Sequence, residues 1–316
     1  MNKMLVSLKR TCWHPLLQRA AQAYVAGPDL ADALAVCRAV CQRGGVCTLG
    51  YWNRSDDSVG TIMDTYRGAL HAVTTECLPC SLSVKGPAFG FSSDLLREIL
   101  DQTRQSGITV VFDSLWPEAA EATFSLLAQI QPFYPTLGCT LPGRWRRSLR
   151  DADRASALGL HVRVVKGQWA DPDEPDRDPR KGFLAVIDRL VGGASHVAVA
   201  THDQHLARVA LRRLRAAGTA CELEMLFGLP ARRVLQIADE EGVPVRLYVP
   251  YGASFLPYRL SHARKIPRVG WWFLRDLLFG RACSWARAKR SIGRVAPSTD
   301  PRPKLGAVML SGSRGN

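Results

Sequence analysis

Eight short apolar, β-branched segments alternate along the chain with amphipathic stretches, and this repetition constrains the fold more than any other feature. The segments are GVCTLG (45–50), SLSVKG (81–86), ITVVFD (108–113), PTLGCTL (135–141), HVRVVKG (161–167), HVAVATHD (196–203), ACELEML (220–226) and VRLYVPYG (245–252). Strands that alternate with helices over short links favour a parallel sheet. Eight repeats in 316 residues predict an α/β fold, a closed (β/α)8 barrel of the TIM type. An open doubly wound sheet is the competing fold, but no glycine-rich dinucleotide fingerprint follows the first strand.

The predicted barrel occupies residues 44–282, between two segments of different composition. Residues 1–43 form an N-terminal segment that is predicted to be helical. Residues 283–316 form a basic tail rich in Pro, Ser and Gly, which we expect to be disordered. The N-terminal sequence is too polar for a secretory signal, and no run of about 18 apolar residues occurs. We therefore expect a cytoplasmic protein.

The chain has a formal net charge of +14, contributed mostly by arginine. The basic residues are spread along predicted helices without interleaved aromatics, so we expect no nucleic-acid binding. The charge is compatible with peripheral docking at the anionic inner face of a membrane. The 9 cysteines are scattered through a long chain, which favours reduced thiols over a disulfide framework. Cys77 and Cys80 have redox spacing but lie in a linker, and we interpret them as buried or incidental thiols.

Charged and polar side chains gather at the C-terminal ends of the predicted strands, where barrel enzymes build their active sites. They are Lys85, Asp113, Arg163, Lys166, Thr201, His202, Glu224 and Tyr248. Unpaired charges in a barrel mouth cost several kcal/mol to bury, so such a cluster implies mutual partners or a polar ligand. The cations Lys85, Arg163 and Lys166 favour an electron-rich or phosphorylated cofactor over a metal ion.

Four motifs in this order resemble those of the proline dehydrogenases, which are flavin-dependent (β/α)8 enzymes. The motifs are HVRVVKGQWADPD, VAVATHDQHLARVA, CELEMLFGLP and GVPVRLYVPYGASFLPYRLSHARKIP. Their usual forms in the family are close to VRLVKGAYW, ATHD, FEFQMLYG and VRVYVPYG. The flanking segments AYVAGPDLADAL and GWWFLRDLL also match, so the resemblance covers most of residues 15–280.

The resemblance implies FAD as the cofactor. Arg163 would lie near the reactive flavin nitrogen and stabilise negative charge there, as its electrostatics also suggest. The residues implied at the cofactor are Arg163, Val165, Lys166, Gly167, Trp169, Thr201, His202 and Glu224. The implied catalytic residues are Lys85, Asp113, Arg163, Tyr248 and Tyr258. Substrate contacts would come from Lys85, Tyr248, Tyr258, Ser261 and His262.

The chain departs from the family pattern mainly on the substrate side. The pair of arginines that clamps the substrate carboxylate falls on Ser261 and His262. Elsewhere Tyr51 replaces a glutamate, Pro142 and Glu224 each replace a glutamine, and Trp169 replaces a tyrosine. Without the bidentate fork of an arginine, the last barrel helix is predicted to hold a small acid less firmly than is usual in the family.

The sequence thus predicts FAD-dependent oxidation of L-proline, or of a proline-like cyclic secondary amine, to the imine, which for proline is 1-pyrroline-5-carboxylate. By resemblance, the partners are the amino-acid or cyclic-amine substrate and a quinone or other electron acceptor. Two alternatives stay open. One is a metal-dependent barrel hydrolase that uses Asp113, His202 and Glu224, with Cys47 as a further ligand. The other is a catalytically decayed flavin-binding paralogue.

Overall fold

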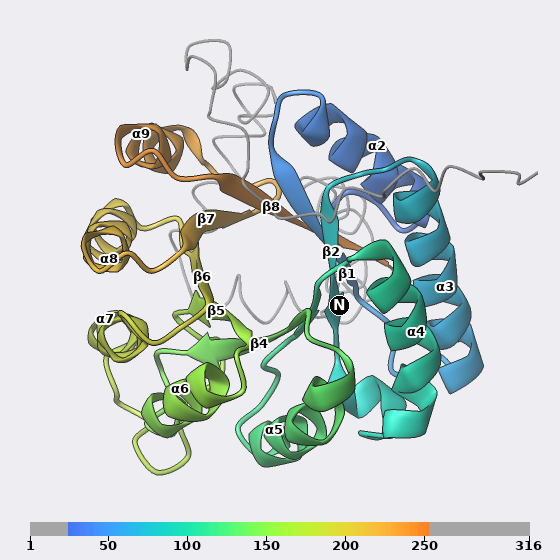
Figure 1. Ribbon diagram of the computed structural model, residues 1–316, viewed down its shortest axis with the longest axis horizontal. Coiled ribbons are helices and arrows are strands. Elements are labelled where there is room, and N and C mark those ends of the chain that lie inside the picture. The colour runs from blue at the N-terminus through green and yellow to red at the C-terminus, as the bar shows by residue number, and fades with distance from the viewer. Residues whose placement is uncertain (1–24, 253–316) are drawn as a thin grey trace, which may run out of the picture.

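A computed structural model of the protein describes residues 25–252, and within this range the chain forms a closed parallel barrel (Figure 1). The strands are β1 (Val46–Tyr51), β2 (Cys80–Val84), β3 (Val110–Phe112), β4 (Leu137–Pro142), β5 (His161–Val165), β6 (His196–Ala200), β7 (Cys221–Leu226) and β8 (Val245–Tyr251). Each strand pairs with the next along the chain, and β8 pairs with β1. The predicted (β/α)8 barrel is confirmed.

Helices surround the barrel and cover its outer face (Figure 1). They are α2 (Leu30–Cys41), α3 (Val59–Thr75), α4 (Ser93–Ser106), α5 (Ala119–Ile130), α6 (Ser148–Ala157), α7 (Pro179–Leu190), α8 (Gln204–Ala216) and α9 (Arg232–Glu240), with the 3-10 turns η1 (Gly86–Phe89) and η2 (Gln131–Phe133). Helix α2 precedes β1 and packs against β1 and β8. No helix within residues 25–252 has the length and apolar character needed to cross a bilayer.

Helix α4 shows how local sequence places such an element. The side chain of Ser92 accepts a hydrogen bond from the backbone N–H of Leu95, which caps the first turn, and Gly107 ends the helix in the left-handed region. Between them Leu96, Ile99, Leu100 and Thr103 recur at helical spacing and are buried. This apolar stripe holds the helix on the barrel wall.

Helix α7 and the loop after β4 touch through two glycines. A Cβ added to Gly182 would fall on the carbonyl oxygen of Gly143, and one added to Gly143 would lie 2.6 Å from the Cα of Phe183. The two backbones are therefore in direct contact, and neither position has room for a side chain.

We expect the Gly182→Ala variant to lower the free energy of unfolding by about 1–3 kcal/mol through overpacking, although alanine is the better helix former. A matched control is Gly68→Ala in α3, where the added Cβ would lie 3.7 Å from a methyl group of Leu30. That variant should gain about 0.5–1 kcal/mol. Urea denaturation of both variants measures the difference. A change of the unfolding free energy in the same direction in both variants would contradict the close contact between the backbones at Gly182 and Gly143.

Candidate active site

Arg163, on β5, is the centre of a buried polar cluster in the barrel interior. Its Nε donates to Oε2 of Glu224 at 2.8 Å, and its Nη1 donates to Oδ1 of Asp113 at 2.9 Å. Nη1 also donates to the hydroxyl of Ser83 at 3.3 Å. Burial by itself would lower the pKa of Arg163, but the charges of Glu224 and Asp113 outweigh it and raise that pKa above its ordinary value. The guanidinium is therefore held charged.

One nitrogen of this guanidinium, Nη2, is buried and has no hydrogen-bond partner among the described residues. The ring of Tyr248 lies against the same group, with its centroid 5.0 Å from Cζ of Arg163. The hydroxyl of Tyr248 donates to Oδ2 of Asp113 at 3.2 Å. Buried donors are seldom left unmatched in proteins. An unmatched donor on a fixed cation is suited to a ligand atom that carries or develops negative charge.

Asp113 and Lys85 extend the cluster toward β2. The hydroxyl of Ser83 donates to Oδ1 of Asp113 at 2.5 Å, so this carboxylate accepts from three side chains. Lys85 directly follows β2 and donates from Nζ to the backbone carbonyl oxygen of Tyr51. Burial lowers the pKa of Lys85 to about 8, although the charge of Asp113 opposes the shift. Lys85 thus titrates near the pH range in which an enzyme works.

A second polar layer lies deeper in the barrel and supports the first. Nε of Arg246 donates to Oε1 of Glu222 at 2.6 Å, and Nη1 of Arg246 donates to Ser81 at 2.9 Å. Burial would raise the pKa of Glu222, but the charge of Arg246 and the hydrogen bond from His196 outweigh it and bring it to about 2. This layer is internally paired. Of the two layers, the one around Arg163 has a buried donor without a partner among the described residues.

The loop after β5 carries the next group of predicted cofactor residues. Val165 ends the strand, and its carbonyl oxygen accepts from the backbone N–H of Gly143 at 2.7 Å. Lys166 is exposed, and its carbonyl oxygen accepts from the backbone N–H of Arg144 at 3.0 Å. Gly167 has a φ of +91°, which turns the chain away from the strand, and the Trp169 side chain that follows is 48% exposed. An exposed cation and an exposed indole therefore stand beside the strand that carries Arg163.

Both ring nitrogens of His202 are hydrogen-bonded to the backbone. Its Nδ1 lies 3.0 Å from the carbonyl oxygen of Pro230, and its Nε2 accepts from the backbone N–H of Leu226 at 2.9 Å. Nδ1 must therefore carry the proton that is donated to Pro230, and burial lowers the pKa of the ring. The histidine ties the end of β6 to the loop after β7. Its neighbour Thr201 is buried and accepts from the backbone N–H of Asp203 at 3.1 Å.

The metal-ligand set of the hydrolase alternative does not assemble in the described part of the chain. Asp113, His202 and Glu224 are not among the described groups whose ligand atoms come close enough to share an ion. Both ring nitrogens of His202 are engaged, and the carboxylates of Asp113 and Glu224 are paired with Arg163. Cys47 belongs to a different cluster, on the outer side of β1. The three predicted residues of the last barrel helix, Tyr258, Ser261 and His262, lie outside the described residues.

Sequence reasoning missed Ser83, Thr48 and Arg144. The hydroxyl of Thr48 donates to Oε1 of Glu224 at 3.2 Å, and Ser83 contacts both Asp113 and Arg163. Nε of Arg144, in the loop after β4, is a further buried donor with no partner among the described residues. A signal for Ser83 was present in the sequence, because Ser81 and Ser83 alternate along β2 in phase with Lys85, which directly follows the strand, and must share one face of the sheet. Arg144 had no such signal.

Comparison with known proteins identifies relatives of this chain. No protein-family model matches the chain. Proline dehydrogenase 1 of Bacillus subtilis subsp. natto is 26% identical over 279 residues, which cover 82% of this chain and 90% of that protein. A proline dehydrogenase of Deinococcus radiodurans is 28% identical over 151 residues, which cover 46% of this chain and 48% of that protein. The chain is thus similar in sequence to proline dehydrogenases over most of its length.

Solved structures share the barrel fold of this chain. Proline utilization A from Bdellovibrio bacteriovorus, inactivated by N-propargylglycine, matches with a TM-score of 0.68 at 14% identity, over 90% of this chain and 37% of that one. Proline utilization A from Corynebacterium freiburgense matches with a TM-score of 0.65 at 13% identity, over 89% of this chain and 33% of that one. The chain thus spans about a third of these longer proteins, and at such identities the likeness concerns the fold alone.

The four motifs that resemble those of proline dehydrogenases occupy neighbouring strands. The first lies on β5, the second on β6, the third on β7 and the fourth begins on β8. Because these strands are consecutive in the closed sheet, Arg163, Thr201, Glu224 and Tyr248 come to one side of the barrel. The four matching motifs therefore lie side by side in the closed sheet.

Proposed function

We propose that this protein is an FAD-dependent dehydrogenase that oxidises L-proline, or a proline-like cyclic secondary amine, to the cyclic imine. The single observation that carries the proposal is Arg163, a buried cation whose Nη2 has no partner among the described residues. The guanidinium is fixed in place by Asp113 and Glu224. A donor fixed in advance stabilises charge that develops during a reaction without having to reorganise.

The donor set around Arg163 fits a flavin. Besides Nη2 of Arg163, it offers the unmatched Nε of Arg144, the exposed ammonium of Lys166 and the exposed ring of Trp169. Cations that present N–H groups suit the phosphates of a dinucleotide, and an indole suits a flat ring. When bound, FAD would accept a hydride from the carbon next to the amine nitrogen. The walls of this cofactor site would be shaped by the backbone at four positions, which are Val165, Gly167, Thr201 and His202.

On the substrate side, Lys85 and Tyr248 would face the amino acid. Lys85 would attract its carboxylate, and the ring of Tyr248 would pack on its apolar ring. Asp113 would keep Tyr248 and Arg163 in position through the hydrogen bonds already described. Tyr258, Ser261 and His262 would complete the pocket from the last barrel helix, with a weaker hold on the carboxylate than an arginine pair would give.

The reaction releases two electrons, and these must leave on a second substrate. A quinone or another small electron acceptor would serve. The net charge of +14 would also favour a peripheral position on an anionic membrane, where quinones reside.

The test is an anaerobic titration of purified, FAD-reconstituted protein, followed by its visible flavin absorbance. L-proline is expected to bleach the flavin, because its secondary amine has a lone pair that supports hydride loss from the adjacent carbon. N-acetylproline, in which the nitrogen is an amide, is the matched control and is expected to leave the absorbance unchanged.

Two results would contradict the proposal. Failure of the folded protein to retain FAD would exclude a flavin enzyme altogether. Retained FAD that no cyclic secondary amine reduces would indicate a binding protein that has lost its catalytic function.

A further inference from the structure

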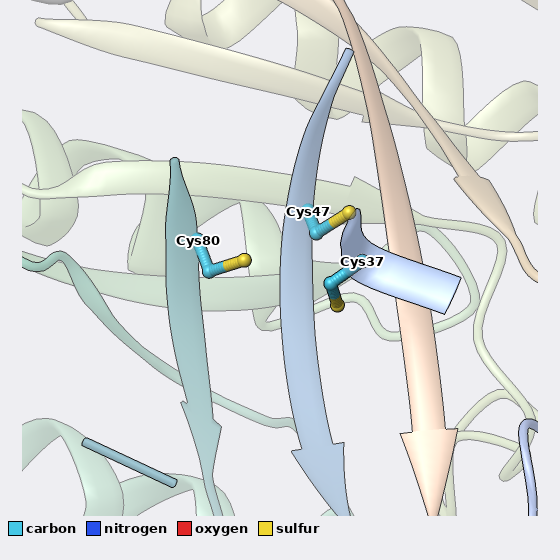
Figure 2. A group of neighbouring side chains, drawn as sticks. All are labelled: Cys37, Cys47 and Cys80. Atoms are coloured by element: carbon cyan, nitrogen blue, oxygen red, sulfur yellow. The ribbon is translucent and has the colours of Figure 1, made fainter. Parts of the chain in front are cut away.

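Three buried cysteines meet on the outer side of the barrel wall. Cys37 lies on α2, and Cys47 and Cys80 are register partners on the neighbouring strands β1 and β2 (Figure 2). Their Sγ atoms all lie within 4.8 Å of one another. Cys37 and Cys47 are 0% exposed and Cys80 is 7% exposed. Because Thr48 points into the barrel toward Glu224, its neighbour Cys47 points outward, so this cluster is separate from the polar site.

A fourth cysteine borders the cluster. Cys41 lies one helical turn after Cys37 on α2, and residues four apart share one face of a helix. The thiols of Cys41 and Cys47 are hydrogen-bonded. Cys41 is partly exposed, so it stands at the rim of the cluster, where a small rotation of its side chain can bring the sulfur inward.

The thiols of the cluster contact one another. Cys37 is hydrogen-bonded to the thiols of Cys47 and Cys80. Arg38, the neighbour of Cys37 in sequence, is committed to Glu76, with its Nε 2.6 Å from Oε2. Several cysteine sulfurs gathered in one small volume are the ligand set that a soft or borderline metal ion prefers.

We propose that Cys37, Cys41, Cys47 and Cys80 bind one Zn²⁺ ion as a structural four-thiolate site. Zinc is bound by thiolates at about 2.3 Å in a tetrahedron, which places the sulfurs about 3.8 Å apart. The three buried sulfurs are already within 4.8 Å, so small side-chain rotations suffice. The all-sulfur ligand set disfavours magnesium and calcium, which prefer oxygen.

The consequence of such a site is a link between α2 and the barrel. Zinc binding would release the thiol protons to solvent and join helix α2 to β1 and β2 through one ion. With all four positions taken by sulfur, the ion has no open position for a substrate and would act on stability alone. Because only the folded chain gathers these four residues, zinc should raise the melting temperature. The proposal stands apart from the flavin chemistry proposed above.

The test begins with the full chain purified under reducing conditions without chelator. One equivalent of zinc per chain is expected by elemental mass spectrometry. After removal of zinc by a chelator, a titration with Co²⁺ is expected to produce a thiolate charge-transfer band and the intense visible bands of tetrahedral cobalt. Added Zn²⁺ should abolish both signals and raise the melting temperature.

Variants separate ligands from bystanders. Cys41→Ser, at the rim, should fold and bind Co²⁺ more than about 100-fold more weakly. Loss of a ligand should weaken metal binding more than loss of a residue that only hydrogen-bonds to a ligand. Cys80→Ser should weaken Co²⁺ binding to a similar extent. The controls are Cys77→Ser, which changes an exposed thiol close to Cys80, and Cys221→Ser, which changes a buried thiol outside the cluster. Both should keep the metal affinity and the cobalt spectrum of the natural sequence.

The proposal would be overturned if the natural protein binds neither Zn²⁺ nor Co²⁺ at one per chain. Equal affinity of the Cys41→Ser and Cys77→Ser variants would also overturn it. A disulfide among the four cysteines under reducing conditions, or a copper(I) complex that does not require Cys41, would likewise exclude the zinc site.

Discussion

The Arg163→Met variant is expected to lose about 3–5 kcal/mol of unfolding free energy, the cost of leaving a buried charge without its partner. Asp113 and Glu224 both depend on this guanidinium, and the side chain of Glu224 is only 2% exposed. Methionine keeps much of the aliphatic volume, so the loss would reflect charge more than packing. Equilibrium urea denaturation of the purified protein measures it.

Two controls isolate the charge effect. Adding Glu224→Gln to Arg163→Met removes one stranded carboxylate, and the double variant should recover a substantial part of the loss. Arg208→Met breaks an exposed pair with Glu240, whose side chains are 37% and 53% exposed, and should cost less than about 1 kcal/mol. Equal losses in Arg163→Met and Arg208→Met would show that the interior pairs stabilise no more than surface ones.

A Lys85→Met variant is expected to slow flavin reduction by proline about 100-fold, the usual cost of removing one preorganised charged donor. The same lysine should confer a pH dependence on binding. Its pKa is lowered to about 8, so the ammonium is charged below that pH and neutral above it. The affinity for a carboxylate ligand should therefore fall as the pH rises through about 8.

The measurement is the dissociation constant of the ring-oxygen analogue of proline, which has no amine to titrate or oxidise, on either side of pH 8. In the natural protein the dissociation constant should rise with pH, because Lys85 loses its positive charge. In Lys85→Arg, which stays charged, it should change little, and in Lys85→Met it should be high at both pH values. A pH-independent affinity in the natural protein would assign the carboxylate to another cation.

The barrel was predictable because its signal is local. Each strand of a parallel barrel is buried on both faces and reads as a short apolar run, and each helix carries its own cap and stripe. The strand-end residues Asp113, Arg163 and Glu224 could be named for the same reason, since alternation along a strand and the direction of the sheet bring them to one end of the barrel. Family motifs added the chemistry that such spacing leaves open.

The partners of these residues were decided by the tertiary structure. Arg163 meets Glu224 across 61 positions and Asp113 across 50, so their pairing depends on barrel closure and strand register rather than on any nearby sequence pattern. His202 was a candidate ligand in the sequence, but the backbone of Leu226, at the end of β7, and of Pro230, in the loop after it, occupies both of its ring nitrogens. No sequence pattern groups Cys37, Cys47 and Cys80, because the three positions share no motif. They meet because α2 packs against β1 and because β1 and β2 pair with Cys47 opposite Cys80. The sequence by itself determined which elements form and which residues end them. Only the folded barrel, through its register and packing, decided which side chains touch.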